Sequence, residues 1–220
     1  MNLLLDLPPD TVMIGGTEYR INTDFRASIL FELLMQDDDV SEYEKVIQSL
    51  QLYFTEYPEG EDVVDVFKAI VWFYRCGRTD KERKKESSGD DDGGSKPERA
   101  YSFDYDDEYI YAAFRQQYGI NLTTVRYLHW WEFRAMFKAL DHDCEFVKIM
   151  GYRTTKITKE MSKTEKAFLR KMKSVHALPV SEREQEETDA LVNALMNGGD
   201  LTGLLGDEGG KSEQGKEDAG

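Results

Sequence analysis

Few residues of this 220-residue chain have the types and spacing that catalysis or metal binding requires. The densest group of metal-ligand types is His142-Asp143-Cys144, in a chain whose three histidines and two cysteines are otherwise scattered. Adjacent residues rarely converge on one ion, and no second pair completes the set. We therefore expect a polar loop between helices here and predict no metal site.

A second cluster combines four carboxylates at positions 104, 106, 107 and 108. Carboxylate oxygens can hold a hard cation, but the cluster lacks the glycine turn and the distal glutamate of an EF-hand loop. Acids in the first turn of a helix are favoured by the helix dipole. The pattern thus predicts the start of a helix and not a cation site.

Motifs for nucleotide and nucleophile chemistry are missing from the sequence. There is no G-x-x-x-x-G-K-[ST], no G-x-G-x-x-G after a strand and no G-x-S-x-G, so the usual phosphate cradles and the nucleophile elbow are absent. We predict no catalytic residues and no cofactor, and we expect that the chain is not an enzyme.

An aromatic group around Tyr127, Trp130 and Trp131 could stack bases or grip a peptide. Its helical spacing within a wide apolar arc favours a place in the core instead. Because the arc is wider than a small helical domain easily covers, we expect one or two of these rings to reach the surface.

Charge is unevenly distributed along the chain, whose formal net charge is −15. This balance argues against nucleic-acid binding, which needs clustered cations. Between Lys148 and Lys173, however, nine lysines and arginines face only two acids. The stretch could attract an acidic partner or pair with the protein's own acidic faces. The second is favoured because charge runs are usually solvated or compensated internally.

The first elements that must position these groups are a hairpin and three helices. A two-glycine turn at Gly15-Gly16 between short alternating strands predicts the hairpin. Apolar residues at helical spacing from Phe25 predict a first helix, which the acids at 37–39 end. A capping box of Ser41 and Glu44 opens a second, and residues 61–75 predict a third helix that is buried on most sides.

The later elements follow a run at 77–99 that lacks aliphatic and aromatic residues and is expected to be a disordered internal connector. Helices are then predicted over 106–118, from 121–124 to Leu140, and over 144–150, with Gly119 ending the first. Capping boxes predict two more, one starting at Ser162 and Glu165 and the last at Ser181 and Glu184.

The expected fold is mainly α: a compact multi-helix domain over 1–198 with a small N-terminal hairpin, followed by a disordered acidic tail over 199–220. No apolar stretch approaches the roughly 20 residues that cross a bilayer, so we expect no membrane contact. The opening leucines lack a basic flank, so no secretion signal is predicted. Cys76 and Cys144 fit free buried thiols in the cytoplasm.

Several ordered segments resemble a family of phage proteins. They are Tyr101 to Phe114 (YSFDYDDEYIYAAF), Tyr118 to Leu122 (YGINL) and Leu128 to Phe133 (LHWWEF), with Leu5 to Pro9, Tyr19 to Arg26 and Ile149 to Arg153. The family occurs in long-tailed phages and prophages of Gram-positive bacteria, typically encoded just before the tape measure gene. The resemblance covers about residues 1 to 175.

The resemblance implies a tail-assembly chaperone that binds the aggregation-prone tape measure protein until tail tube subunits replace it. It implies action in the host cytoplasm, absence from the mature virion and self-association along the client, with the tail tube protein as a further candidate partner. The alternative is a structural component of the tail or connector that stays in the virion.

Our binding hypothesis assigns apolar client contacts to leucines of the last helix and tail, and the ordering of subunits along the client to basic residues before them. The assigned residues are Lys163, Lys166, Arg170, Lys171, Leu191, Leu195, Leu201, Leu204 and Leu205.

Overall fold

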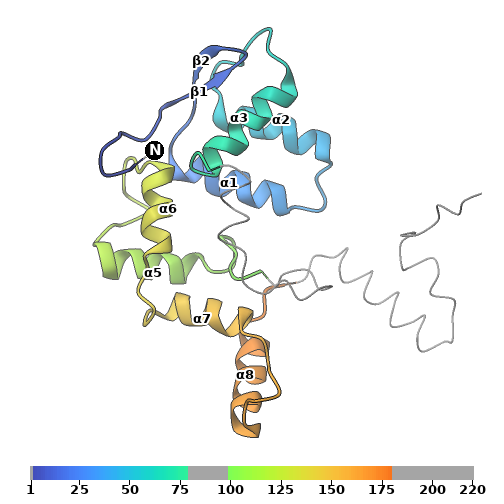
Figure 1. The fold of residues 1–220 in the computed structure, drawn as a ribbon, viewed down its shortest axis with the longest axis vertical. Coiled ribbons are helices and arrows are strands. Elements are labelled where there is room, and N and C mark those ends of the chain that lie inside the picture. The colour runs from blue at the N-terminus through green and yellow to red at the C-terminus, as the bar shows by residue number, and fades with distance from the viewer. Residues whose placement is uncertain (1, 79–98, 180–220) are drawn as a thin grey trace, which may run out of the picture. The chain divides into compact units, whose positions relative to one another are not determined.

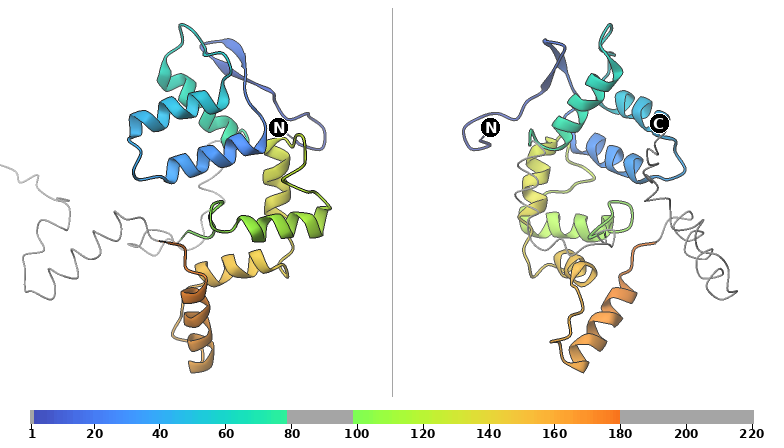
Figure 2. Two further views of the ribbon diagram at one scale, coloured as in Figure 1. Left: turned by 180° about the vertical axis from the view of Figure 1, so that it is seen from behind. Right: turned by 45° about the vertical axis from the view of Figure 1, so that its right-hand side comes forward.

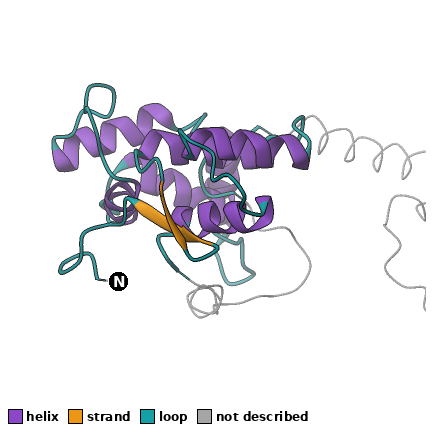
Figure 3. Cartoon of the chain, turned by 90° about the horizontal axis from the view of Figure 1, so that it is seen from above, coloured by secondary structure: helices purple, strands orange, loops and turns teal. Residues whose placement is uncertain are grey.

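The computed structural model of the chain describes residues 2–78 and 99–179, and the elements below all lie in the compact unit Met1–Leu178. Seven helices and two strands are described there, and Figure 3 shows that the strands form only the hairpin. The predicted mainly α fold with an N-terminal hairpin is confirmed. Most of the predicted connector, the helix expected after Ser181 and the acidic tail lie outside the described residues.

The hairpin joins β1 (Thr11–Ile14) to β2 (Thr17–Arg20) in antiparallel register, with Val12 opposite Tyr19. Gly15 and Gly16 have φ angles of 56° and 89°, the left-handed values that a tight turn of this kind needs. The side chains of Val12 and Ile14 are buried, so β1 is the strand that joins the hairpin to the core.

Three helices follow as predicted: α1 (Phe25–Gln36), α2 (Glu42–Tyr53) and α3 (Val63–Tyr74) (Figure 1). Ser41 and Glu44 form the expected capping box at the start of α2. The expectation that α3 is buried on most sides is wrong, because Val64 and Trp72 are exposed. One face of α3 packs against α2 and β1 and leaves the opposite face open.

The remaining helices are α5 (Asp107–Tyr118), α6 (Trp130–Lys138), α7 (Glu145–Thr154) and α8 (Lys163–Val175). Contacts join α1 to α6, α5 to α7 and α7 to α8. The views in Figure 2 show α8 joined to α7 by a loop and lying at an angle to it. Only one side chain of α8, that of Leu169, is buried, so this helix offers most of its surface to solvent.

An aromatic core joins the two sets of helices. Phe133 of α6 stacks on Phe25 of α1 at 5.0 Å and on Phe114 of α5 at 4.9 Å between ring centroids. Trp130 and Trp131 donate their indole N–H groups to the carbonyl oxygens of Tyr74 and Phe73, each at 2.8 Å. Two tryptophans of α6 thereby bond to carbonyls at the C-terminal end of α3, where the Phe73 carbonyl also accepts from the Cys76 amide at 2.9 Å.

The helix predicted from 121–124 to Leu140 is wrong in its first half, since α6 begins only at Trp130. Asn121 caps a single turn, and the chain then extends and pairs with the segment before α1. The Phe25 amide donates to the Leu128 carbonyl at 3.0 Å, and the Trp130 amide donates to that of Thr23 at 2.8 Å. These long-range bonds replace the helical bonds that the periodicity suggested.

Within the described residues, none of the helices combines the length and the apolar character that a bilayer span requires.

Candidate partner-binding surfaces

The four basic residues that the sequence singled out lie together on α8. A capping box of Ser162 and Glu165 starts this helix as predicted, and exposed Lys163, Arg170 and Lys171 project from it. Lys166 is half-buried and donates to the Lys159 carbonyl at 2.9 Å.

Within the described ranges, no ion pair neutralises these exposed cations. Their charge is therefore available to an acidic partner.

Apolar side chains share this exposed side of α8. Thr164, Phe168, Lys171 and Val175 follow one another at spacings of four, three and four residues, which places them on one helix face. The side chains of Phe168 and Val175 are 53% and 62% exposed. We call these four residues the α8 stripe. It mixes apolar contact area with positive charge, as a protein-binding helix does.

Other cations of the basic stretch serve the protein's own structure. Arg153 is buried and pairs with buried Asp106 through two bonds, of 2.6 and 2.8 Å. It also donates to the carbonyls of Ala100 (3.1 Å) and His176 (2.6 Å). The Lys173 ammonium donates to the Arg153 carbonyl. The expected internal pairing is thus confirmed for Arg153, and attraction of an acidic partner stays a prediction.

This pairing also corrects our interpretation of the acidic cluster. Asp106 is 1% exposed and accepts from the Ser102 amide at 2.9 Å in addition to the guanidinium. Its neighbours Asp104, Asp107 and Glu108 are exposed, and the last two lie in the first turn of α5. Asp106 therefore anchors α5 to α7, whereas its neighbours remain on the surface.

The prediction that most of these rings lie in the core and one reaches the surface is confirmed, but Tyr127 precedes α6 and is not on the helix. The side chains of Trp130 and Trp131 are buried, while Tyr127 is 55% exposed and its hydroxyl bonds to that of Thr23 at 2.7 Å. His129 caps α6 by accepting from the Trp131 amide through Nδ1, so its Nε2–H donates to the Pro9 carbonyl at 3.1 Å. Burial lowers the pKa of His129 below its ordinary value.

Around His142 the structure brings three potential ligands within 4.8 Å of one another: Asp141, His142 and Asp143. All three are exposed, and Cys144 lies instead at the N-cap of α7. Exposed acidic groups of this kind are common without an ion, so we assign no metal site to this cluster. Both cysteines are free thiols, half-buried rather than fully buried.

The leucines that we assigned to client contacts, Leu191, Leu195, Leu201, Leu204 and Leu205, lie outside the described residues. A different leucine group is exposed at the start of the chain. Leu4, Leu5 and Leu7 have 92%, 82% and 91% of their side chains exposed, and Leu3 has 46%. We call these four residues the leucine arm. Four leucines within five positions, without the spacing that would bury them on a helix, indicate such an exposed segment in the sequence.

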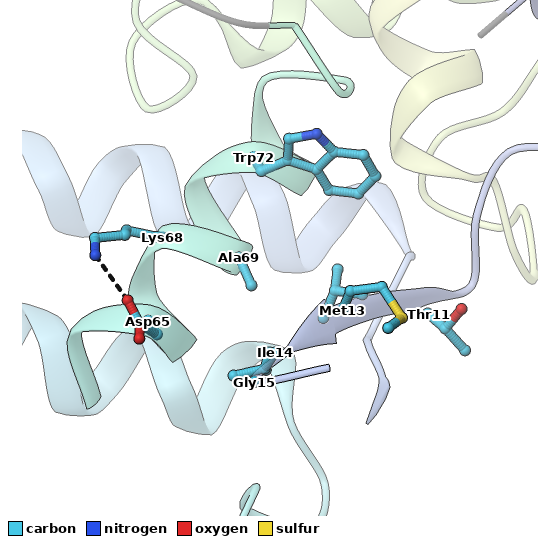
Figure 4. Close-up of a pocket in the computed structure, with 9 residues that line it drawn as sticks. Thr11, Met13, Ile14, Gly15, Asp65, Lys68, Ala69 and Trp72 are labelled. Atoms are coloured by element: carbon cyan, nitrogen blue, oxygen red, sulfur yellow. Dashed lines mark hydrogen bonds and ion pairs between the residues drawn. The ribbon is translucent and has the colours of Figure 1, made fainter. Parts of the chain in front are cut away.

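A pocket of about 460 Å³ opens between the hairpin and α3 (Figure 4). Its walls include Met13, Ile14, Ala69 and Trp72, and the Lys68 ammonium pairs with Asp65 at 2.7 Å beside it. Met13 is 63% exposed and Trp72 41% exposed. Because methionine adapts to varied apolar shapes, this pocket suits a variable apolar partner.

A second cavity, of about 600 Å³, is built from α1, the start of α5, the loop before α6, and α6 itself. Phe25, Phe103, Ile110 and Phe133 form apolar walls, and exposed Asp107 and Glu108 are also among its lining residues. We call it the α5 cavity. Sequence analysis missed it because its walls come from four separate segments, and only the folded chain brings them together.

Comparison with known proteins identifies a family. The family model described as Bacteriophage Gp15 protein matches residues 4–178, which include every described helix. No curated protein matches the chain. No solved structure matches it either.

Proposed function

We propose that this chain, which belongs to the bacteriophage Gp15 protein family, acts as a tail-assembly chaperone. In this role it binds the tape measure protein and keeps it soluble until the tail tube polymerises around it. The proposal places the activity in the host cytoplasm and assigns the chain no catalytic step and no cofactor.

The observation that carries the proposal is the leucine arm. Three of its side chains are more than four-fifths exposed, which is costly for a protein that functions alone, because apolar surface in water is unfavourable. A tape measure helix presents long apolar stripes of its own. Contact between the arm and such a stripe would remove both surfaces from water.

The hairpin pocket supports the same role by offering a second apolar contact. Met13 and Trp72 are exposed at its edge, and the flexible Met13 thioether requires no defined polar partner. Weak, adaptable contacts of this type suit a chaperone, whose client must later be released to the tail tube. The net charge of −15 would keep a loaded complex dispersed.

The test is co-expression of the chain with the tape measure protein encoded beside it, followed by affinity capture and sizing. We expect a soluble complex, and we expect Leu4→Asp with Leu5→Asp to return the client to the insoluble fraction. Leu30→Asp is the matched control, because Leu30 is a 52% exposed leucine on α1, outside the arm. Equal client solubility with the arm variant and the control would refute the role of the arm.

A second measurement separates the chaperone from a structural tail component. Mass spectrometry of purified virions should find tape measure and tail tube proteins but not this chain. Its stoichiometric presence in mature particles would overturn the proposal in favour of a structural protein.

A further inference from the structure

We propose that the free edge of β1 binds one extended, uncharged segment of a second protein. The segment adds a third strand to the hairpin and places its apolar side chains in the pocket between β1 and α3. This binding mode goes beyond the chaperone proposal, in which the pocket only adds an apolar contact. It specifies the backbone conformation and the chemistry of the partner, and it holds for any protein that supplies such a segment.

The backbone of β1 carries hydrogen-bonding groups that β2 does not use. The Ile21 amide donates to the Asp10 carbonyl at 3.1 Å, so these two residues form a bonded pair. Bonded and non-bonded pairs alternate along an antiparallel ladder, which makes positions 12 and 14 the next bonded residues of β1. The N–H and C=O groups of Thr11 and Met13 therefore point away from β2. Within the described residues, neither of these two amides donates to another acceptor.

The two edges of the hairpin differ in their protection against pairing. Free strand edges commonly carry charged side chains, which discourage the addition of another strand. On β2 the residues whose backbone groups point outward are Glu18 and Arg20, both charged and exposed. On β1 they are the uncharged Thr11 and Met13. The edge of β1 is therefore the one that can accept a strand.

The pocket runs along this edge. Residues 11–15 all line it, although the side chains of successive strand residues point to opposite faces. None of its lining residues belongs to β2. A pocket that touches consecutive residues of β1 alone lies beside the strand rather than over one face of the hairpin. Its other wall is α3, with Ala69 and Trp72 (Figure 4). A strand that pairs with β1 consequently enters this pocket.

The chemistry of the pocket selects the occupant. The charged side chains in its lining are those of Asp65 and Lys68, which pair with each other at 2.7 Å. No uncompensated charge is left in the lining, so an uncharged segment suits it. The volume of about 460 Å³ accommodates a few apolar side chains but not a folded domain.

A second copy of this chain does not fit the site. Its own β1 edge is bordered by its own α3, which packs against β1. Two such edges cannot approach to the spacing of paired strands, about 4.8 Å. The occupant is therefore a single extended segment without neighbouring structure on either side, and its main chain supplies the hydrogen bonds.

The experiment measures amide hydrogen exchange by NMR in the full chain, with and without the probe peptide acetyl-Ser-Val-Ser-Val-Ser-Val-amide. We expect the Thr11 and Met13 amides to exchange rapidly in the free chain. With free peptide at ten times its dissociation constant, their exchange should slow about tenfold, because the bound edge is protected. The Glu18 and Arg20 amides on the opposite edge are the internal control and should not change.

Two N-methylated peptides separate strand pairing from simple apolar contact. Alternate N–H groups of a paired strand face β1, so methylation of the valine series and of the serine series should differ. One series should abolish binding in titration calorimetry, and the other should leave it intact. A slip by one residue cannot rescue the first, because it turns the valines to the opposite face. Both peptides keep the same side chains, so an apolar contact without hydrogen bonds would treat them alike.

A matched pair of variants tests the same bonds from the side of the protein. Met13→Pro removes one outward N–H of β1 and leaves the ladder with β2 intact, and Glu18→Pro makes the same change at the residue opposite. Met13→Pro should weaken peptide binding about tenfold, whereas Glu18→Pro should not. Met13→Val keeps the N–H and should bind as the wild type does. Circular dichroism verifies the fold, and if Met13→Pro does not fold, the methylated peptides test these bonds on the wild-type chain.

Three results would overturn the proposal. They are exchange at Thr11 and Met13 that the peptide does not slow, equal affinity of the two methylated peptides, and slow exchange of these amides in the free chain. The last would mean that another part of the chain or a second copy already occupies the edge. Because the tape measure protein is absent, none of these results bears on the chaperone role, which the co-expression experiment tests separately.

Discussion

The buried pair of Arg153 and Asp106 should be the most sensitive polar contact of the described fold. Replacing Arg153 by Met keeps an unbranched side chain of similar length but removes four N–H···O bonds, two to the carboxylate and two to backbone carbonyls. Asp106, which is 1% exposed, would keep only its bond from the Ser102 amide. The variant therefore leaves a buried negative charge without a counter-charge.

The expected loss is about 3–5 kcal/mol of the free energy of unfolding, the usual cost of removing one partner of a buried ion pair. A domain of this kind has a total stability of about 5–15 kcal/mol, so the loss is a large fraction of it. The matched control is Arg115→Met on α5. Arg115 is exposed and donates to a single carbonyl, that of Gly119, so its loss should cost less than about 1 kcal/mol.

Urea unfolding followed by circular dichroism measures both variants, and an unchanged slope against denaturant would show that only stability has changed. Combining Arg153→Met with Asp106→Asn removes both charges. This double variant should be more stable, by about 1–3 kcal/mol, than the sum of the two single losses implies. Additive losses, or an Arg153→Met variant no weaker than Arg115→Met, would refute the pairing argument.

Three further predictions concern the aromatic core and two glycines. Burial lowers the pKa of His129, so stability should fall as the pH drops below about 6.5, and His129→Asn should flatten this dependence, as pH-dependent thermal unfolding will test. Trp131→Phe should cost about 1–3 kcal/mol in urea unfolding, because a buried hydrogen bond is lost and a smaller ring fills the same space in the core. Gly151→Ala inside α7 should stabilise by about 1 kcal/mol, since nothing lies within 4 Å of the added Cβ. Gly77→Ala should instead destabilise the fold, because the φ of Gly77 is 70° and the added Cβ would lie 3.1 Å from the Trp131 ring. A lower melting temperature for Gly151→Ala than for Gly77→Ala would contradict both glycine predictions.

Most of the helical fold was predictable because its determinants are local. The capping boxes at Ser41 and Ser162 join residues three apart, and Gly119 has the left-handed φ that ends α5. The same reasoning overextended α6, whose apolar pattern begins well before Trp130. There, hydrogen bonds to the segment before α1 outweighed helical periodicity, and those bonds join residues more than 100 positions apart.

Of the candidate surfaces, the sequence identified the basic residues of α8 but not their surroundings. The basic residues of α8 could be found from the charge run, because a capped helix with few apolar positions must leave them in water. The run alone could not show that Arg153 is internal while Lys171 is exposed. That difference depends on Asp106, which lies 47 residues away along the chain.

What the sequence by itself determined is where most of the helices begin and end, and that the chain is acidic with one basic stretch. Only the tertiary structure decided that two tryptophans complete the end of α3, that one arginine of the basic stretch is buried, and that four segments enclose the α5 cavity. The physical reason is the sequence separation of the residues that interact. Caps and periodicity act within a few residues, whereas burial, ion pairing and cavity walls arise from side chains that folding brings together from distant positions.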